Sequence, residues 1–190
     1  LVLTGGILGG VRGPESGKLT RELLAPPFFA SFLLLALFAL ISLLTLRGLD
    51  LPRQSVEERR SGGRPLALIA RQPAFIVAVI AAAGGYAIMI LLMSATPLAM
   101  HLSQHPFADS AFVLEWHVIG MFAPSFFTGA LIQRFGVINI LLCGAGLMLA
   151  CVSIAIAGVS LMHFWGALLL LGIGWNFLYI GGTTLLTETY

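Results

Sequence analysis

Long runs of uncharged, apolar residues constrain the fold of this chain more than any other feature of its sequence. Residues 135–187 contain no Asp, Glu, Lys or Arg over 53 residues, and residues 23–46 and 73–100 are uncharged in the same way. About 20 apolar residues in a helix cross a bilayer. Only 9% of the residues are charged, against roughly a quarter in a soluble domain. The sequence therefore predicts an all-α, polytopic membrane protein and excludes a soluble domain.

The uncharged runs predict five complete transmembrane helices and one partial helix. The longest run is too long for one crossing, so we divide it at a polar turn at residues 158–163. A second, tight turn is expected at residues 133–136. The predicted spans are a half span at 1–11 and whole spans at 23–46 (with Pro26 and Pro27 at its start), 73–100, 113–132, 137–158 and 163–187.

A hydrophilic segment at residues 47–71 divides the chain. Basic residues near helix ends stay on the cytoplasmic side, and this segment holds six of the ten basic residues. We therefore predict a cytoplasmic linker at 47–71 between regions at 1–46 and 72–190. Alternation of the spans also places Arg134 inside, whereas three basic residues at 12–21 fall outside, against the rule. The six residues of the linker are Arg47, Arg53, Arg59, Arg60, Arg64 and Arg71.

Polar residues at mid-depth distinguish helices that line a hydrated pathway from helices that face lipid. The spans at 73–100 and 163–187 carry such residues and are predicted to line a cavity. The spans at 23–46 and 137–158 carry few polar residues and are predicted to be peripheral.

Four residues of the two predicted cavity helices are candidates for a substrate pathway: Tyr86, Trp175, Asn176 and Thr183. Asn176, beside Trp175, lies at mid-depth, where transporters bind their substrates. An interhelical hydrogen bond is an equally good interpretation of a membrane asparagine, and the same ambiguity applies to Tyr86. Both interpretations stay open at this point.

Glu115 and His117 lie near the predicted start of the span at 113–132. They permit two interpretations. Charged groups near a helix end can reach water cheaply, which makes both residues interfacial. Alternatively, a carboxylate in a cleft takes up protons at ordinary pH, which makes Glu115 a proton-coupling group with His117 titrating nearby.

Glycines recur every four residues near the beginning of the chain, at positions 5, 9, 13 and 17. Such a helix face lets a neighbouring helix approach closely. The segment Gly9-x-x-x-Gly13-Pro14-x-x-Gly17 resembles the glycine-proline signature on the fifth helix of the major facilitator superfamily (MFS), which is associated with antiporters. Lys18 stands where that pattern ends in glycine.

A second motif follows the span at 113–132. Gly129-Ala-Leu-Ile-Gln-Arg134-Phe-Gly136 resembles the cytoplasmic loop signature of the MFS, Gly-x-x-x-Asp-Arg-x-Gly, with Gln133 in place of the aspartate. The aspartate's charge is therefore missing, while the tight turn is kept.

The two resemblances agree in register and cover nearly the whole chain, from late helix five to helix ten of a 12-helix fold with inverted repeats. They imply an internal fragment of a multi-pass transporter in the inner or plasma membrane of the cell. The implied activity is secondary transport of a small solute by alternating access, with proton-coupled antiport as a hypothesis. The implied partners are a small-molecule substrate, protons and lipid. The alternative is a non-transporting membrane sensor or assembly protein on the same fold.

Enzyme and cofactor motifs fail on inspection. The segment 13–18 has three residues between its glycines where a phosphate-binding loop needs four, and Leu19 follows Lys18 where that loop needs Ser or Thr. Neither a His-Glu-x-x-His zinc pattern nor a Gly-x-Ser-x-Gly elbow occurs. The net charge of +2 is too small to suggest a nucleic-acid partner. We therefore predict no enzyme site, no cofactor, no metal and no nucleic acid.

Overall fold

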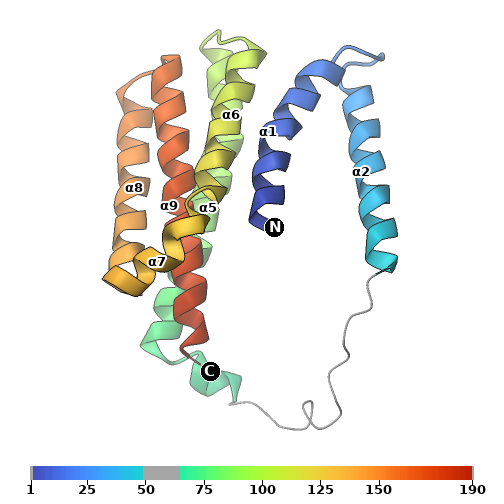
Figure 1. The fold of residues 1–190 in the computed structure, drawn as a ribbon. Coiled ribbons are helices and arrows are strands. Elements are labelled where there is room, and N and C mark those ends of the chain that lie inside the picture. The colour runs from blue at the N-terminus through green and yellow to red at the C-terminus, as the bar shows by residue number, and fades with distance from the viewer. Residues whose placement is uncertain (1, 49–64, 190) are drawn as a thin grey trace. The chain divides into compact units, whose positions relative to one another are not determined.

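The structure is a computed structural model that describes residues 2–48 and 65–189. Every regular element in these residues is a helix, which agrees with the predicted all-α class (Figure 1). The helices are α1 (Val2–Thr20), α2 (Phe29–Arg47), α4 (Leu66–Ile69), α5 (Pro73–Leu102), α6 (Phe107–Phe122), α7 (Ser125–Phe135), α8 (Val137–Ala157) and α9 (Leu161–Thr187).

The chain divides into two compact units, which we describe separately. One is Glu15–Arg64, and the other combines Leu1–Pro14 with Pro65–Tyr190. Of the predicted linker, residues 49–64 lie outside the described residues. The division into regions at 1–46, 47–71 and 72–190 stays a prediction.

The predicted membrane spans are confirmed by helix length and composition. In the described part of the chain, α2, α5, α8 and α9 are each long and apolar enough to cross a membrane, and there are five spans if the bent pair of α6 and α7 counts as one. The protein is therefore a multi-pass membrane protein. Helix α2 begins at Phe29 instead of Leu23, because Phe28 has a left-handed backbone (φ 67°) that cannot continue a helix toward the preceding prolines.

The prediction of one continuous helix at 113–132 is wrong. The structure has two helices, α6 and α7, bent by 43° at a short break (Figure 1). The break contains Pro124, which has no backbone N–H to donate to the carbonyl of Gly120. The helix also begins earlier than predicted, at Phe107, so Glu115 and His117 lie well inside it.

Helix α1 is longer than the predicted half span at 1–11. It runs to Thr20 through a polar stretch, where Lys18 Nζ lies 2.6 Å from Glu15 Oε1 and Thr20 Oγ1 lies 2.6 Å from the Ser16 carbonyl oxygen. Pairing of charges three apart stabilises a helix that apolar content alone would not sustain.

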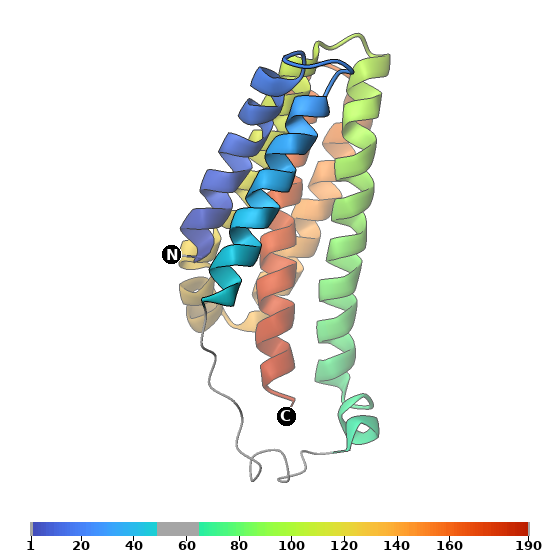
Figure 2. The ribbon, with the colours of Figure 1, turned by 90° about the vertical axis from the view of Figure 1, so that its right-hand side faces the viewer.

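Helix α9 is the centre of the larger unit. Figures 1 and 2 show α5, α6 and α8 lying beside it, and thirteen of its residues are buried. Helix α8 buries one face against it and exposes the other, which includes Leu142, Leu149 and Ile156. An apolar face that is left uncovered in a membrane protein meets lipid, in agreement with the predicted peripheral position of this helix.

Glycines explain why three helices can approach α9 closely. A Cβ added at Gly172 would collide with the backbone of α6 at the His117 carbonyl oxygen, and one at Gly174 would lie 3.0 Å from the Gly144 carbonyl oxygen of α8. On the α5 side, a Cβ at Gly182 would lie 3.1 Å from the Ala78 carbonyl oxygen. Small residues at such crossings let helix backbones meet.

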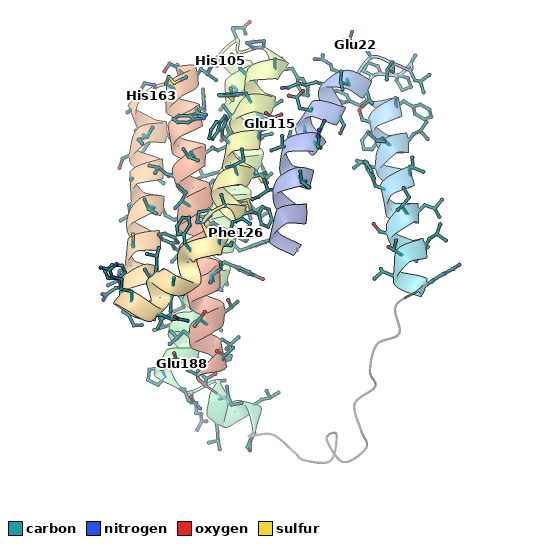
Figure 3. The ribbon with its side chains drawn as sticks, in the orientation of Figure 1. Glu22, His105, Glu115, Phe126, His163 and Glu188 are labelled. Atoms are coloured by element: carbon teal, nitrogen blue, oxygen red, sulfur yellow. The ribbon has the colours of Figure 1, made fainter. Side chains whose placement is uncertain are left out.

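The ends of the helices alternate as predicted within this unit. The start of α5, the α7–α8 turn and the end of α9 lie toward its lower end in Figure 1. The predicted tight turn at 133–136 is shorter in the structure, because residues 133–135 belong to α7 and only Gly136, whose φ of 84° favours glycine, lies between α7 and α8. At the opposite end, His105 Nε2 lies 2.8 Å from the Val159 carbonyl oxygen and connects the α5–α6 loop to the α8–α9 turn (Figure 3).

Candidate functional site

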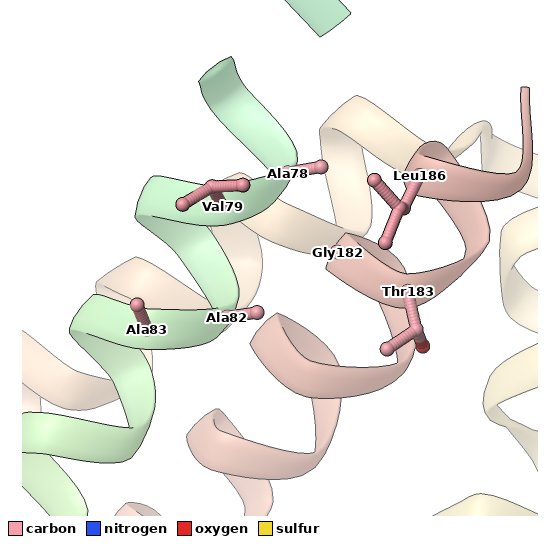
Figure 4. Close-up of a pocket in the computed structure, with 7 residues that line it drawn as sticks. All are labelled: Ala78, Val79, Ala82, Ala83, Gly182, Thr183 and Leu186. Atoms are coloured by element: carbon pink, nitrogen blue, oxygen red, sulfur yellow. The ribbon is translucent and has the colours of Figure 1, made fainter. Parts of the chain in front are cut away.

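A groove between α5 and α9 is the candidate site. It contains a cavity of about 200 Å³ with apolar walls, shown in Figure 4. The floor forms where Gly182 brings α9 close to α5. The residues that line the cavity are Ala78, Val79, Ala82, Ala83, Gly182, Thr183 and Leu186.

Thr183, one of the predicted pathway residues, lies in this lining. Its hydroxyl lies 2.8 Å from the Tyr179 carbonyl oxygen and 3.0 Å from that of Ile180, both in its own helix. The hydroxyl proton is therefore used by the backbone, as is usual for threonine in membrane helices. The cavity presents a mainly apolar surface to a ligand.

Aromatic residues lie on the same face of α9 as Thr183. On α9, Trp175, Tyr179 and Thr183 follow at intervals of four, so their side chains share one face. The rings of Trp175 and Tyr179 stack in parallel, with centroids 4.9 Å apart and an interplanar angle of 9°. Tyr179 is 43% exposed. Trp175 is buried, and among the described residues its indole N–H has no hydrogen-bond partner. The stacked pair therefore offers the exposed ring of Tyr179, whereas the indole N–H of Trp175 is enclosed by protein.

Tyr86 of α5 lies at the level of this pair. Gly85 contacts Leu178, and these two residues precede Tyr86 and Tyr179 directly. Tyr86 also follows Ala83 by three residues, which places it on the cavity-lining face of α5. It is 51% exposed. Of the predicted pathway residues, Thr183 thus lines the cavity, Tyr86 lies on the cavity-lining face of α5, and Trp175 is buried against Tyr179.

Asn176 does not face this groove. It is 1% exposed, and its side chain bonds to the residues around the α6–α7 break, with Nδ2 2.6 Å from the Met121 carbonyl oxygen. The interhelical interpretation of this residue therefore fits the structure better than a substrate contact. Thr128 also bonds to Asn176 and is not among the residues predicted from the sequence. Its position four residues after Pro124, where a threonine hydroxyl can bond to the proline carbonyl, indicates its role.

Glu115 and His117 point in different directions from α6. His117 is fully buried, and its Nδ1 lies 2.8 Å from the Leu168 carbonyl oxygen of α9. Since a carbonyl only accepts, Nδ1 carries the proton. Among the described residues Nε2 has no partner. The interfacial interpretation of His117 is wrong, because tight α6–α9 packing excludes it from water.

Glu115 is half-buried and lies on another face of α6 (Figure 3). It shares that face with Val118 and Phe122, which follow it by three and seven residues. These two side chains contact α1. A Cβ added at Gly10 would collide with Val118, and a Cβ added at Gly6 would lie 3.0 Å from the Phe122 ring.

The predicted glycine face of α1 is therefore shifted by one residue. Gly6 and Gly10 make the close contacts, whereas a Cβ at Gly5, Gly9 or Gly13 would meet no described atom within 4 Å. The same holds for Gly17 within its own unit, and Pro14 lies inside the helix. Contacting glycines are four residues apart, as predicted. The sequence contains two series with this spacing, one beginning at Gly5 and one at Gly6, and the second makes the contacts.

The second motif forms the end of α7. A Cβ at Gly129 would meet no described atom within 4 Å, and the Arg134 guanidinium lies 5.2 Å from the centre of the Phe135 ring. Gly136 makes the turn. The motif shapes a helix connection, as predicted.

Comparisons with known proteins identify relatives. Along its whole length the chain is similar to the riboflavin transporter RfnT of Brucella anthropi, with 42% identity over 192 residues, which are 48% of that protein. YdeG and YddS of Bacillus subtilis, both named uncharacterised MFS-type transporters, are each 36% identical over 104 residues, which are 54% of this chain and 24% of each relative. No family model and no solved structure matches. The chain thus spans about half the length of the riboflavin transporter. These relatives are named for transport, a non-enzymatic function, which agrees with the predicted absence of an enzyme site.

Proposed function

We propose that the chain forms part of a secondary transporter of the major facilitator superfamily, because it is similar to a riboflavin transporter and to two proteins named MFS-type transporters. This transporter would move a small solute across a cell membrane by alternating access. The observation that carries the proposal is the 42% identity to a riboflavin transporter over the whole chain. The Arg-rich segment at 47–71 supports a cytoplasmic position for the linker.

The proposed substrate class is a flat aromatic heterocycle such as riboflavin. The name of the relative suggests this class, and the groove has suitable chemistry. A planar ring system can stack on the exposed face of Tyr179, since offset-stacked aromatic pairs are favourable. Tyr86 lies on the same face of α5 as the cavity-lining Ala83 and is 51% exposed, which makes it a second candidate for such a contact.

Replacing Tyr179 by alanine is expected to raise the KM for riboflavin about 2- to 10-fold, because one stacking contact contributes about 0.5–1.5 kcal/mol. The measurement is uptake of labelled riboflavin by proteoliposomes that contain the complete protein. Phe112→Ala is the matched control, since Phe112 is 36% exposed and its ring packs against Trp116 of its own helix. An unchanged KM in the Tyr179 variant would exclude this groove, and a wild-type protein without riboflavin flux would exclude the substrate class.

We propose Glu115 as the proton-coupling group. A half-buried carboxylate inside an apolar span is costly and is a functional candidate by default. His117 is less suited to this role, because it is fully enclosed and its N–H is used by the backbone of α9.

Glu115→Gln is expected to abolish uptake driven by a pH gradient while leaving exchange of labelled for unlabelled substrate at equal pH intact. The glutamine keeps the size of the side chain but cannot carry a proton between states. Glu188→Gln is the control, since Glu188 is an exposed carboxylate just after α9. Flux of the wild-type protein that is indifferent to a pH gradient would rule out proton coupling altogether.

A further inference from the structure

The break between α6 and α7 leaves backbone carbonyl groups without their helical donors. In a continuous helix the Met121 carbonyl oxygen would accept the N–H of Ser125, but the helix ends at Phe122 and restarts at Ser125. In an apolar bundle each such group needs a substitute partner. Helix α9 supplies that partner through one side chain, Asn176.

The Asn176 amide is fully engaged at the break. Its Nδ2 lies 2.6 Å from the carbonyl oxygen of Met121, which is in the last turn of α6. The same nitrogen lies 2.5 Å from Oγ of Ser125, which is the first residue of α7. Its Oδ1 lies 2.7 Å from Thr128 Oγ1. The Thr128 hydroxyl also lies 2.8 Å from the Pro124 carbonyl oxygen, so its single proton is shared between two acceptors. One amide thus binds both sides of the break.

Burial restricts what this amide can do. Asn176 is 1% exposed and Thr128 is fully buried, and both amide hydrogens of Asn176 have acceptors. A polar group with these partners in an apolar interior is costly to separate from them. It therefore has no hydrogen left to offer a substrate in this conformation.

We propose that Asn176 is a positioning residue that holds the bend between α6 and α7, with Thr128 as its partner. It sets the direction in which α7 leaves α6 toward the turn at Gly136 and α8. The effect on transport rests on the proposed function, whereas the effect on the bend does not. A residue that holds a bend acts on the rate of conformational change, not on the affinity for substrate.

The bend is tested by amide hydrogen exchange of the complete protein in detergent, read by mass spectrometry. Asn176→Leu removes all three contacts at similar volume. Exchange in peptides covering residues 119–130 is expected to rise at least about tenfold, while peptides from α8 stay within about twofold. Thr128→Val added to Asn176→Leu should change little more, because the two side chains act together. Thr96→Val is the control, since within the described residues its hydroxyl bonds to the Leu92 carbonyl oxygen of its own helix, α5. Unchanged exchange at 119–130, or an equal rise over the whole bundle, would overturn the proposal.

Transport kinetics separate positioning from substrate binding. Asn176→Leu is expected to lower the maximal rate of riboflavin uptake at least about fivefold and to leave KM within about twofold. A raised KM at an unchanged maximal rate would overturn the proposal and assign Asn176 to the substrate site. If the wild-type protein moves no riboflavin, the proposed substrate is wrong, and the exchange experiment still decides the role of Asn176.

Discussion

Replacing Gly172 by alanine is expected to prevent α6 and α9 from packing as they do in the native protein. The added methyl group would collide with the His117 carbonyl oxygen and would lie 2.9 Å from the Met121 backbone nitrogen and 3.0 Å from the Gly120 carbonyl carbon. All three are backbone atoms, so no side chain can rotate out of the way. Overpacking lowers the free energy of unfolding by about 1–3 kcal/mol, and a collision with backbone belongs at the upper end of that range.

The measurement is the midpoint of thermal unfolding of the complete protein in detergent, together with the yield of monodisperse protein. A loss of this size lowers the midpoint by about 10 °C in a chain of this length. Gly166→Ala, on the same helix, is the control, because its Cβ would meet only Ile154 Cγ2 at 4.0 Å. If both variants unfold at the wild-type temperature, the close α6–α9 crossing does not exist.

Replacing Gly144 by leucine is expected to separate α8 from α9. Even the Cβ would lie 3.0 Å from the Gly174 carbonyl oxygen and 3.0 Å from Phe177 Cβ, and the rest of the side chain has no space. The buried face of α8 would lose its contact with α9, including Met148 and Cys151. We expect the free energy of unfolding to fall by about 3 kcal/mol, similar to the effect at Gly172.

The control for this variant lies two residues away. A Cβ at Gly146 would meet no described atom within 4 Å, and the residue is exposed on the outer face of α8. Gly146→Leu should keep or slightly raise the unfolding temperature, because leucine favours the helix over glycine. Equal effects of the two leucines on thermal unfolding would contradict the assigned face of α8.

The spans were predictable because charge is nearly absent from them and present between them. The uncharged run after Arg134 contains α8 and α9 with a turn at the predicted place. The bounds of α2 were less accurate, since two prolines are compatible with the first turn of a helix as well as with the loop before it. Only the left-handed backbone of Phe28 decides between them.

The absence of charge does not predict the bend after α6. Pro124 was visible in the sequence, but a proline in a membrane helix can be accommodated by a kink without a break. The outcome depends on Asn176, which is 52 residues further along the chain and substitutes for the missing helical donor. Partners at this separation have no local signature.

The candidate site was partly predictable. Polar and aromatic residues in apolar spans predict Tyr86, Trp175 and Thr183, and of these Thr183 lines the cavity that forms where α5 and α9 pack together. A polar residue in an apolar span also predicts Asn176 as a pathway residue, but its side chain faces the α6–α7 break. Asn176 directly follows Trp175 in the sequence. One residue along a helix turns a side chain by about 100°, so composition alone could not assign its face.

The close crossings of α9 with α6 and α8 have a mechanical consequence. At Gly172 and at Gly144 with Gly174, backbone lies against backbone, and a backbone has no alternative rotamers with which to yield. Neither partner can rotate or slide along α9 without lifting away from it. In a transport cycle of the proposed kind these three helices would therefore move as one rigid lever. Displacement at one end of α9 would therefore be passed through this block to the other end.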